Sequence, residues 1–157
     1  MTLSSGVPFS VLVDGDPDRD ATDENAARPN LIPGVSLTPP GGSTPNLWFN
    51  PAAFGPPVPG FRGSAGRNIL NGPDFKSVDL SIGKNFRIDE RRSLQFRGEI
   101  FNLFNRANFD LPSNSEDGEL VFNFSPPSTF VPVGTAGRIF GTVGDSREIQ
   151  LGVKFIF

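Results

Sequence analysis

The side chains best suited to metal chemistry are concentrated in one acidic run. The segment "DGDPDRD" places an aspartate at every second position from Asp14 to Asp20, and hard cations such as Ca²⁺ bind clustered carboxylate oxygens. The EF-hand pattern requires Gly at the sixth position and Glu at the twelfth, but counting from Asp14 puts Arg19 and Asn25 there. A calcium site and a solvated acidic loop both remain open, and we assign no metal site.

A second candidate for chemistry is the set formed by Asp79, Arg97 and Glu99. Two carboxylates near a cation could do acid-base catalysis, but nothing in the sequence fixes their spacing, and a charged wall facing water explains them as well. The chain has no His and no Cys, which excludes imidazole and thiolate ligands and the Ser-His and Cys-His nucleophile pairs. We therefore expect no enzymatic activity, no catalytic residue and no cofactor.

Aromatic residues cluster in the segment "WFNPAAF", Trp48 to Phe54. These rings could form a platform for a ligand, or they could anchor a long loop to the rim of a larger structure. Aromatic rings more often anchor than bind. The anchoring interpretation is therefore favoured.

Composition favours strands and loops as the elements that position these residues. Gly 18 and Pro 16 make up more than a fifth of the 157 residues, and both disfavour long helices. The chain has 16 Phe, one Trp and no Tyr, and such purely apolar rings must be buried in a core or in lipid. The formal net charge of −3 provides no basic field for nucleic acid.

No segment of the sequence reads as a membrane helix or as a secretory signal. There is no run of about 18 apolar residues, the length a transmembrane helix needs, and "MTLSSGVPFSV" has no basic region followed by an apolar run. If the chain reaches a membrane, we expect strands to cross it and another segment to supply the export signal.

Four segments alternate apolar and polar residues, as strands with one apolar face do. They are residues 7–13, 77–88, 93–104 and 147–157. The second and third are joined by the polar turn "DERR", which predicts an antiparallel hairpin. Residues 14–76 and 105–146 are rich in Gly, Pro, Asn and Ser and are expected to form two long loops, the second with a candidate short strand at "ELVFNF".

The alternation of short and long connections is typical of an outer-membrane barrel, which has short periplasmic turns and long external loops. Charged residues such as Arg97 and Lys154 would face the interior, where a soluble sandwich needs apolar side chains. We therefore expect an all-β fold, with antiparallel strands of a transmembrane outer-membrane β-barrel. About four strands cannot close a barrel, which needs about eight, so the chain is expected to be part of a larger wall.

The order of several motifs resembles one family. The motifs are "WFNPAAF", "GRN", "DLSIGKNF", "FNLFNRANF" and the terminal "REIQLGVKFIF". From about Ser4 to Phe157 the sequence resembles the C-terminal portion of TonB-dependent receptor-like outer-membrane proteins, in particular the Oar-like members that begin with a carboxypeptidase regulatory-like domain. This resemblance implies location in the cell outer membrane and a contribution of wall strands and extracellular loops to substrate uptake.

The resemblance also implies a set of partners. They are the remainder of the β-barrel and its plug, the outer-membrane assembly machinery, lipid, and the TonB complex, reached through N-terminal parts that this chain lacks. No nucleic acid is expected among them.

The last strand carries the candidate site. Ile149, Leu151, Val153, Phe155 and Phe157 share one face if residues 147–157 form a strand. A C-terminal strand ending in Phe resembles the signal that the outer-membrane assembly machinery reads in such barrels. The resemblance therefore implies that these five residues form the barrel-assembly signal, and the alternative is a plain edge strand with a terminal Phe by chance.

Two other functions remain open from the sequence. One is a secreted, soluble β-sandwich module whose long loops bind a ligand, and which would unfold cooperatively in plain buffer. The other is a truncated gene product without independent function.

Overall fold

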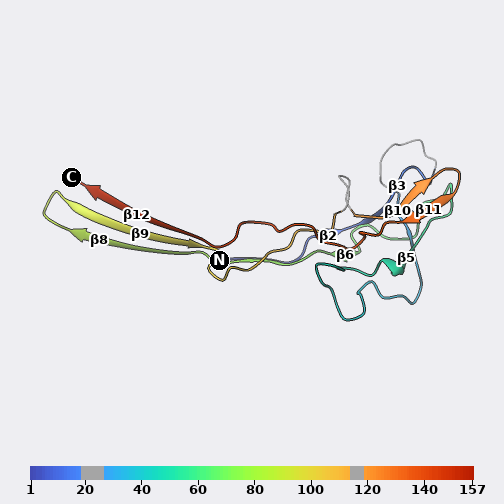
Figure 1. Cartoon of the computed structure of the whole chain (residues 1–157), viewed down its shortest axis with the longest axis horizontal. Coiled ribbons are helices and arrows are strands. Elements are labelled where there is room, and N and C mark those ends of the chain that lie inside the picture. Colours follow the sequence, from blue (N-terminus) through green and yellow to red (C-terminus); the bar gives the residue numbers. More distant parts are fainter. Residues whose placement is uncertain (19–26, 114–118) are drawn as a thin grey trace. The chain divides into compact units, whose positions relative to one another are not determined.

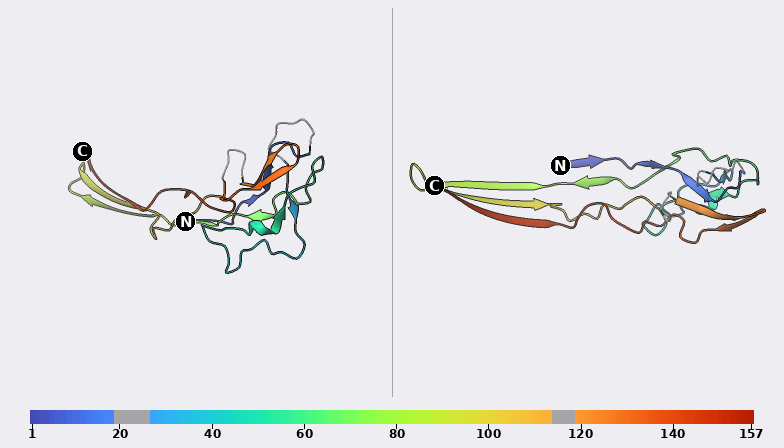
Figure 2. Two further views of the ribbon diagram at one scale, coloured as in Figure 1. Left: turned by 45° about the vertical axis from the view of Figure 1, so that its right-hand side comes forward. Right: turned by 90° about the horizontal axis from the view of Figure 1, so that it is seen from above.

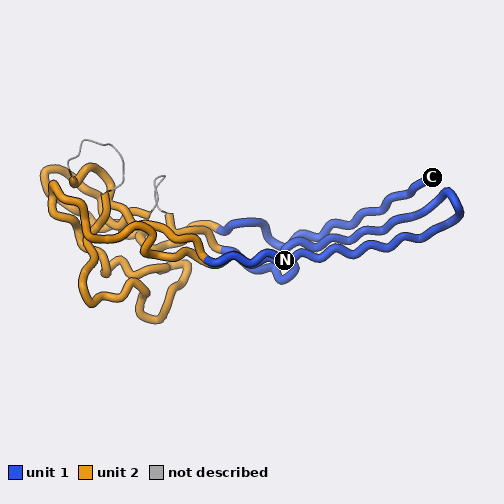
Figure 3. The backbone as a smooth tube through the Cα atoms, turned by 180° about the vertical axis from the view of Figure 1, so that it is seen from behind, with its two compact units in different colours: residues 1–5, 74–108, 142–157 blue, residues 6–73, 109–141 orange. Residues whose placement is uncertain are grey.

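The computed structural model describes residues 1–18, 27–113 and 119–157. They form two compact units (Figure 3): unit 1 comprises residues 1–5, 74–108 and 142–157, and unit 2 comprises residues 6–73 and 109–141. The regular structure is almost entirely β-strand, and the short 3-10 helix η1, Pro51–Ala53, lies in unit 2. Within the described residues, no helix is long and apolar enough to cross a bilayer.

Unit 1 is built around three long antiparallel strands. Its strands are β1 (Thr2–Ser4), β7 (Phe75–Ser77), β8 (Leu80–Arg87), β9 (Ser93–Phe101) and β12 (Glu148–Ile156). The long strands form a sheet in the order β12-β9-β8 and run side by side in Figures 1 and 2, while β1 pairs antiparallel with β7. Each long strand alternates apolar and polar residues, which gives the sheet two different faces.

The connection between β8 and β9 is a tight polar turn. Asp89 Oδ1 accepts hydrogen bonds from the backbone N–H groups of Arg91 at 2.9 Å and Arg92 at 2.8 Å, and Ile88 N donates to Arg92 O at 2.9 Å. An Asp side chain that bonds the backbone two residues ahead forms a turn on its own. The expected hairpin is therefore present, with "DERR" as its turn.

The predicted strands 77–88 and 93–104 are both shorter in the structure. β9 ends at Phe101 because Asn102 adopts a positive φ of 47°, so Phe104, the last residue of the predicted strand, lies beyond it. The ladder of β8 begins only at Leu80, because Val78 O accepts from Leu103 N at 2.7 Å instead of from a strand partner.

Unit 2 contains several short strands in three small sheets. They are β2 (Pro8–Phe9), β3 (Val11–Asp14), β4 (Asn30–Leu31), β5 (Phe54–Gly55), β6 (Leu70–Asn71), β10 (Glu119–Ser125) and β11 (Thr129–Pro132). The sheets are β11-β10-β3, β2-β6 and β4-β5. The β10–β3 pair is parallel, with a register shift between Leu120 and Phe122, whereas the other strand pairs of the described residues are antiparallel. The strand expected at "ELVFNF" is β10.

The stretches predicted as long loops pack around a hydrophobic core of their own. Val11 and Val13 are 0% exposed, and they cluster with Phe49, Phe54 and Val121. Residues 7–13 therefore form β2 and β3 inside this core, not one two-faced wall strand. The strands within the ranges 14–76 and 105–146 are only two to seven residues long, and apart from β10 they are too short for alternation to be recognised in stretches rich in Gly, Pro, Asn and Ser.

The close approach of two backbone segments in unit 2 requires glycine at position 63. Gly63 N donates to Arg28 O at 3.1 Å, and Ala65 N donates to Pro29 O at 3.0 Å. A Cβ on Gly63 would overlap the backbone of Arg28 and Pro29. Two loop segments thus run in contact at a point where only Gly fits.

Candidate functional site

One face of the β8–β9–β12 sheet is apolar except for Lys84. The register brings side chains into four rows across the strands: Leu80, Ile100 and Ile149; Ile82, Gly98 and Leu151; Lys84, Phe96 and Val153; Phe86, Leu94 and Phe155. Most of these side chains are exposed, Leu151 at 84%. An exposed apolar surface of this extent marks contact with lipid or with another protein.

The opposite face of the same sheet is polar. Its rows are Ser81, Glu99 and Gln150; Gly83, Arg97 and Gly152; Asn85, Gln95 and Lys154; Arg87, Ser93 and Ile156. Arg97 Nη2 pairs with Glu99 Oε1 at 2.6 Å. A sheet with one apolar and one charged face matches a barrel wall between lipid and an aqueous lumen.

The expected set of Asp79, Arg97 and Glu99 forms only in part. Asp79 Oδ1 instead accepts hydrogen bonds from Asn102 N at 3.0 Å and Ser77 Oγ at 3.2 Å. Asp79 therefore fixes the end of β9 at Asn102, and the ion pair between Arg97 and Glu99 stands without it. Both arrangements are structural contacts in the wall.

Four of the five residues predicted as the assembly signal lie together on the apolar face. Ile149, Leu151, Val153 and Phe155 each pair with a β9 residue of that face. Phe157 follows the end of β12, where its ring stacks on that of Phe155 with 6.0 Å between centroids. The structure thus places these residues on one surface, and their reading by the assembly machinery stays a prediction.

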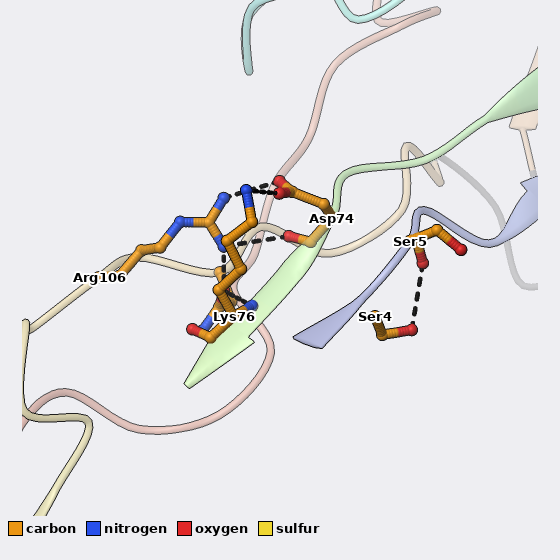
Figure 4. A network of polar contacts seen from close by, with 6 residues as sticks. Ser4, Ser5, Asp74, Lys76 and Arg106 are labelled. Carbon is orange, nitrogen blue, oxygen red and sulfur yellow. Dashed lines mark hydrogen bonds and ion pairs between the residues drawn. The ribbon is translucent and has the colours of Figure 1, made fainter. Parts of the chain in front are cut away.

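Beyond the end of the sheet, unit 1 contains a polar network that the sequence analysis missed (Figure 4). Arg106 Nη2 pairs with Asp74 Oδ1 at 2.7 Å, and Arg106 Nη1 donates to Asn108 Oδ1 at 2.6 Å. Lys76 pairs with the second oxygen of Asp74, and Asn108 bonds both the N–H and the C=O of Lys76. The hydrogen bonds from Lys76 and Arg106 lower the pKa of Asp74 to about 2.

Asn102 joins this network to the segment before β12. Its Nδ2 donates to Arg106 O at 3.0 Å and to Asp145 O at 3.1 Å, and its Oδ1 accepts from Arg106 N at 3.0 Å. No sequence pattern marks the contact with Asp145, because it joins residues 43 positions apart in the chain. The positive φ of Asn102 is a conformation that Asn tolerates better than most residues.

A cavity of about 300 Å³ lies in unit 1 beside this network. Its lining includes Asp79, Phe101, Asn102, Glu148 and Gln150, so it combines carboxylates, amides and an aromatic ring. In the described part of the chain, no three acidic side chains come close enough together to hold a metal ion.

In the acidic run "DGDPDRD", Asp18 forms an ion pair within unit 2. Asp18 Oδ2 accepts from Arg62 Nε at 2.8 Å, whereas Asp20 lies outside the described residues. The calcium hypothesis for this run stays untested.

The aromatic segment "WFNPAAF" anchors unit 2. The rings of Phe49 and Phe54 meet edge to face at 5.7 Å, and both residues are buried. Trp48 is half-buried, and its Nε1 donates to Asn71 O at 2.8 Å. The rings of Phe49 and Phe54 therefore pack in the core of unit 2, and anchoring to the rim of a larger structure stays a prediction.

The sequence analysis also missed a buried carboxyl group in unit 2. Glu119 is 1% exposed, its Oε1 accepts from Gly137 N at 2.5 Å, and its Oε2 has no hydrogen-bond partner among the described residues. Burial raises the pKa of Glu119 to about 7, against the opposing effect of the Gly137 bond. In the sequence, Glu119 is only the first residue of a candidate strand, and no pattern there predicts that its side chain is buried.

Comparison with known proteins gives one family. A model of the family described as "Outer membrane beta barrel domain" matches residues 1–150. Neither the search of curated proteins nor that of solved structures found a match. The matched range includes β8, β9 and the start of β12, whose sheet has the two faces of a barrel wall. The chain belongs to the outer membrane beta barrel domain family, and its place is the outer membrane.

Proposed function

We propose that this chain forms the C-terminal part of a TonB-dependent receptor-like transporter. In this proposal β8, β9 and β12 are wall strands, and the long connections that include unit 2 belong to the extracellular side. The sheet with one apolar and one charged face carries the proposal, because a large transporter barrel needs lipid contact outside and water inside.

Three further observations support the proposal. The cavity of about 300 Å³ has polar and acidic lining residues, among them Glu148 and Gln150 of the polar face. Three long strands cannot close a barrel, which needs about eight, so the wall requires further strands. The motif order of the sequence is similar to that of receptor barrels that also hold a plug.

The proposal assigns partners and excludes catalysis. The partners are the remaining strands and plug, lipid, the TonB complex, and the assembly machinery, which would read Ile149, Leu151, Val153, Phe155 and Phe157. Transport energy would come from the TonB complex, and no residue of this chain would act as a catalyst.

The test is crosslinking in living cells. Cells that express the full-length protein carrying these strands are treated with a crosslinker, and outer-membrane fractions are probed for a covalent adduct with TonB. We expect an adduct that increases when excess transport substrate is supplied. A protein that fractionates with outer membranes but never crosslinks to TonB would refute the transport proposal and leave the family assignment intact.

A further inference from the structure

We propose that the apolar face of the β8–β9–β12 sheet holds one anionic phospholipid, with its phosphate at Lys84 and an acyl chain in a notch beside Gly98. This site depends on contact between the apolar face and lipid, and it does not depend on transport.

Lys84 is the one charged residue that the strand register places on the apolar face. It shares a row with Phe96 and Val153. Within the described residues, no carboxylate lies within ion-pair distance of its Nζ, which instead lies 5.9 Å from the centroid of the Phe86 ring. A cation in an apolar surface is unfavourable unless it reaches a polar boundary or an anion.

The position of Lys84 relative to the short turn indicates the boundary that it reaches. Lys84 lies three residues before the end of β8 at Arg87, which is about 10 Å along an extended strand. The Phe86 ring, over which its amine lies, belongs to the last row before that turn. Short turns of outer-membrane barrels face the periplasm, so the amine is at the level of the periplasmic headgroups.

An apolar notch opens beside Gly98, one row farther from the turn. It has a volume of about 210 Å³ and is lined by Ile82, Ile100, Ile149 and Leu151, among others. The nearest atom to a Cβ placed on Gly98 would be Leu151 Cδ2 at 3.6 Å, an ordinary contact. Neither packing nor a positive φ therefore requires Gly here, and a strand glycine often marks a site where a ligand comes close.

The distance between Lys84 and the notch, and their sequence from the periplasmic turn toward the middle of the bilayer, match the headgroup and acyl chain of one phospholipid molecule. Neighbouring rows lie about 7 Å apart along the strands, with the cation toward the periplasmic turn and the notch toward the middle of the bilayer. A headgroup phosphate at Lys84 would leave an acyl chain running over Val153 toward Gly98. Inorganic phosphate could use the cation but would leave the notch empty, which distinguishes the two sources of phosphate.

The experiment is native mass spectrometry of the full-length protein that carries these strands, purified from outer membranes in mild detergent. Dioleoylphosphatidylglycerol and zwitterionic dioleoylphosphatidylcholine are titrated separately. We expect one tightly bound lipid, with a preference for phosphatidylglycerol. Lys84→Gln should weaken phosphatidylglycerol binding about fivefold, the effect of one Lys near an anionic headgroup, and Lys84→Arg should restore it.

Filling the notch tests the acyl-chain half of the site. Gly98→Ile should weaken binding of both lipids without changing the preference for phosphatidylglycerol. Lys154→Gln, on the polar face, is the matched control and should bind both lipids like the wild type. Heat-modifiable migration on gels verifies that each barrel is folded. If Lys84→Gln does not fold, Lys84→Met is measured in its place, and if Gly98→Ile does not fold, Gly98→Val is measured in its place.

Two results would overturn the proposal. One is lipid binding by folded Lys84 and Gly98 variants that equals that of the wild type. The other is displacement of phosphatidylglycerol by inorganic phosphate at millimolar concentration, which would indicate a simple anion contact at the amine.

Discussion

The buried carboxyl group of Glu119 should make the stability of unit 2 depend on pH. Its folded-state pKa is about 7, raised from 4.5 by burial. Below pH 4.5 both the folded and the unfolded chain hold this proton. Between pH 4.5 and 7 the unfolded chain releases it while the folded chain keeps it, so the free energy of unfolding falls as pH rises through this interval.

The size of the effect follows from the pKa difference. One pKa unit corresponds to about 1.36 kcal/mol, so the shift sets an upper limit of about 3 kcal/mol. Water that reaches the ionised side chain would reduce the penalty, and we expect about 1–3 kcal/mol. The chain has no His, so no side chain with an unperturbed pKa near neutrality adds a titration there.

The single tryptophan provides the assay. Trp48 N donates to Gly137 O at 2.6 Å, and Gly137 N donates to Glu119 Oε1 at 2.5 Å, so one residue, Gly137, links the carboxyl group to the backbone of the fluorescent residue. Thermal unfolding followed by Trp48 fluorescence should give a midpoint about 5 °C or more lower at pH 7.5 than at pH 5.

Glu119→Gln is the decisive variant. The amide keeps the oxygen that accepts from Gly137 but does not ionise, so the difference in midpoint between the two pH values should disappear. Asp110→Asn, at an exposed carboxyl group of the same unit, is the matched control and should keep the wild-type difference. Equal wild-type midpoints at both pH values, or an unchanged difference in Glu119→Gln, would refute the reasoning.

Three further predictions concern the wall, the core and the end of the sheet. Leu151→Lys should destabilise the folded barrel by about 2–4 kcal/mol in urea unfolding, whereas Gln150→Lys on the polar face should change it little; equal effects would contradict the assigned faces. Phe49→Ala should cost unit 2 about 3–5 kcal/mol by Trp48 fluorescence, and a change below 1 kcal/mol would exclude Phe49 from the core. Asn102→Ala and Asn102→Asp both remove the Nδ2 donor that bonds Asp145 O, so both should speed amide exchange in residues 142–147; exchange equal to that of the wild type would show that this bond contributes nothing.

The long strands could be predicted because their alternation is local. The pairing of Lys84 with Phe96 follows once the hairpin turn at Asp89 is recognised, since the turn fixes the register of β8 and β9. β12 could be predicted as a strand from alternation alone. Its position beside β9 depends on pairing between distant segments, which periodicity does not encode.

The core of unit 2 and the polar network of unit 1 could not be predicted for the same reason. Phe49 is buried against Phe9 and Phe54 through loops whose course no short pattern determines. Arg106 meets Asp74 across 32 positions of sequence. The sequence shows that such residues are apolar or charged, but only the fold shows which of them meet.

The most direct test of the membrane-facing sheet is spin labelling along β12. The chain has no Cys, so single cysteines at positions 149 to 155 of the full-length protein in outer-membrane vesicles can be labelled one at a time. Collision with oxygen, which dissolves in lipid, and with a water-soluble nickel complex is then measured at each position. We predict high oxygen and low nickel access at Ile149, Leu151, Val153 and Phe155, and the reverse at the positions between. Equal nickel access at all positions would contradict a lipid-facing wall.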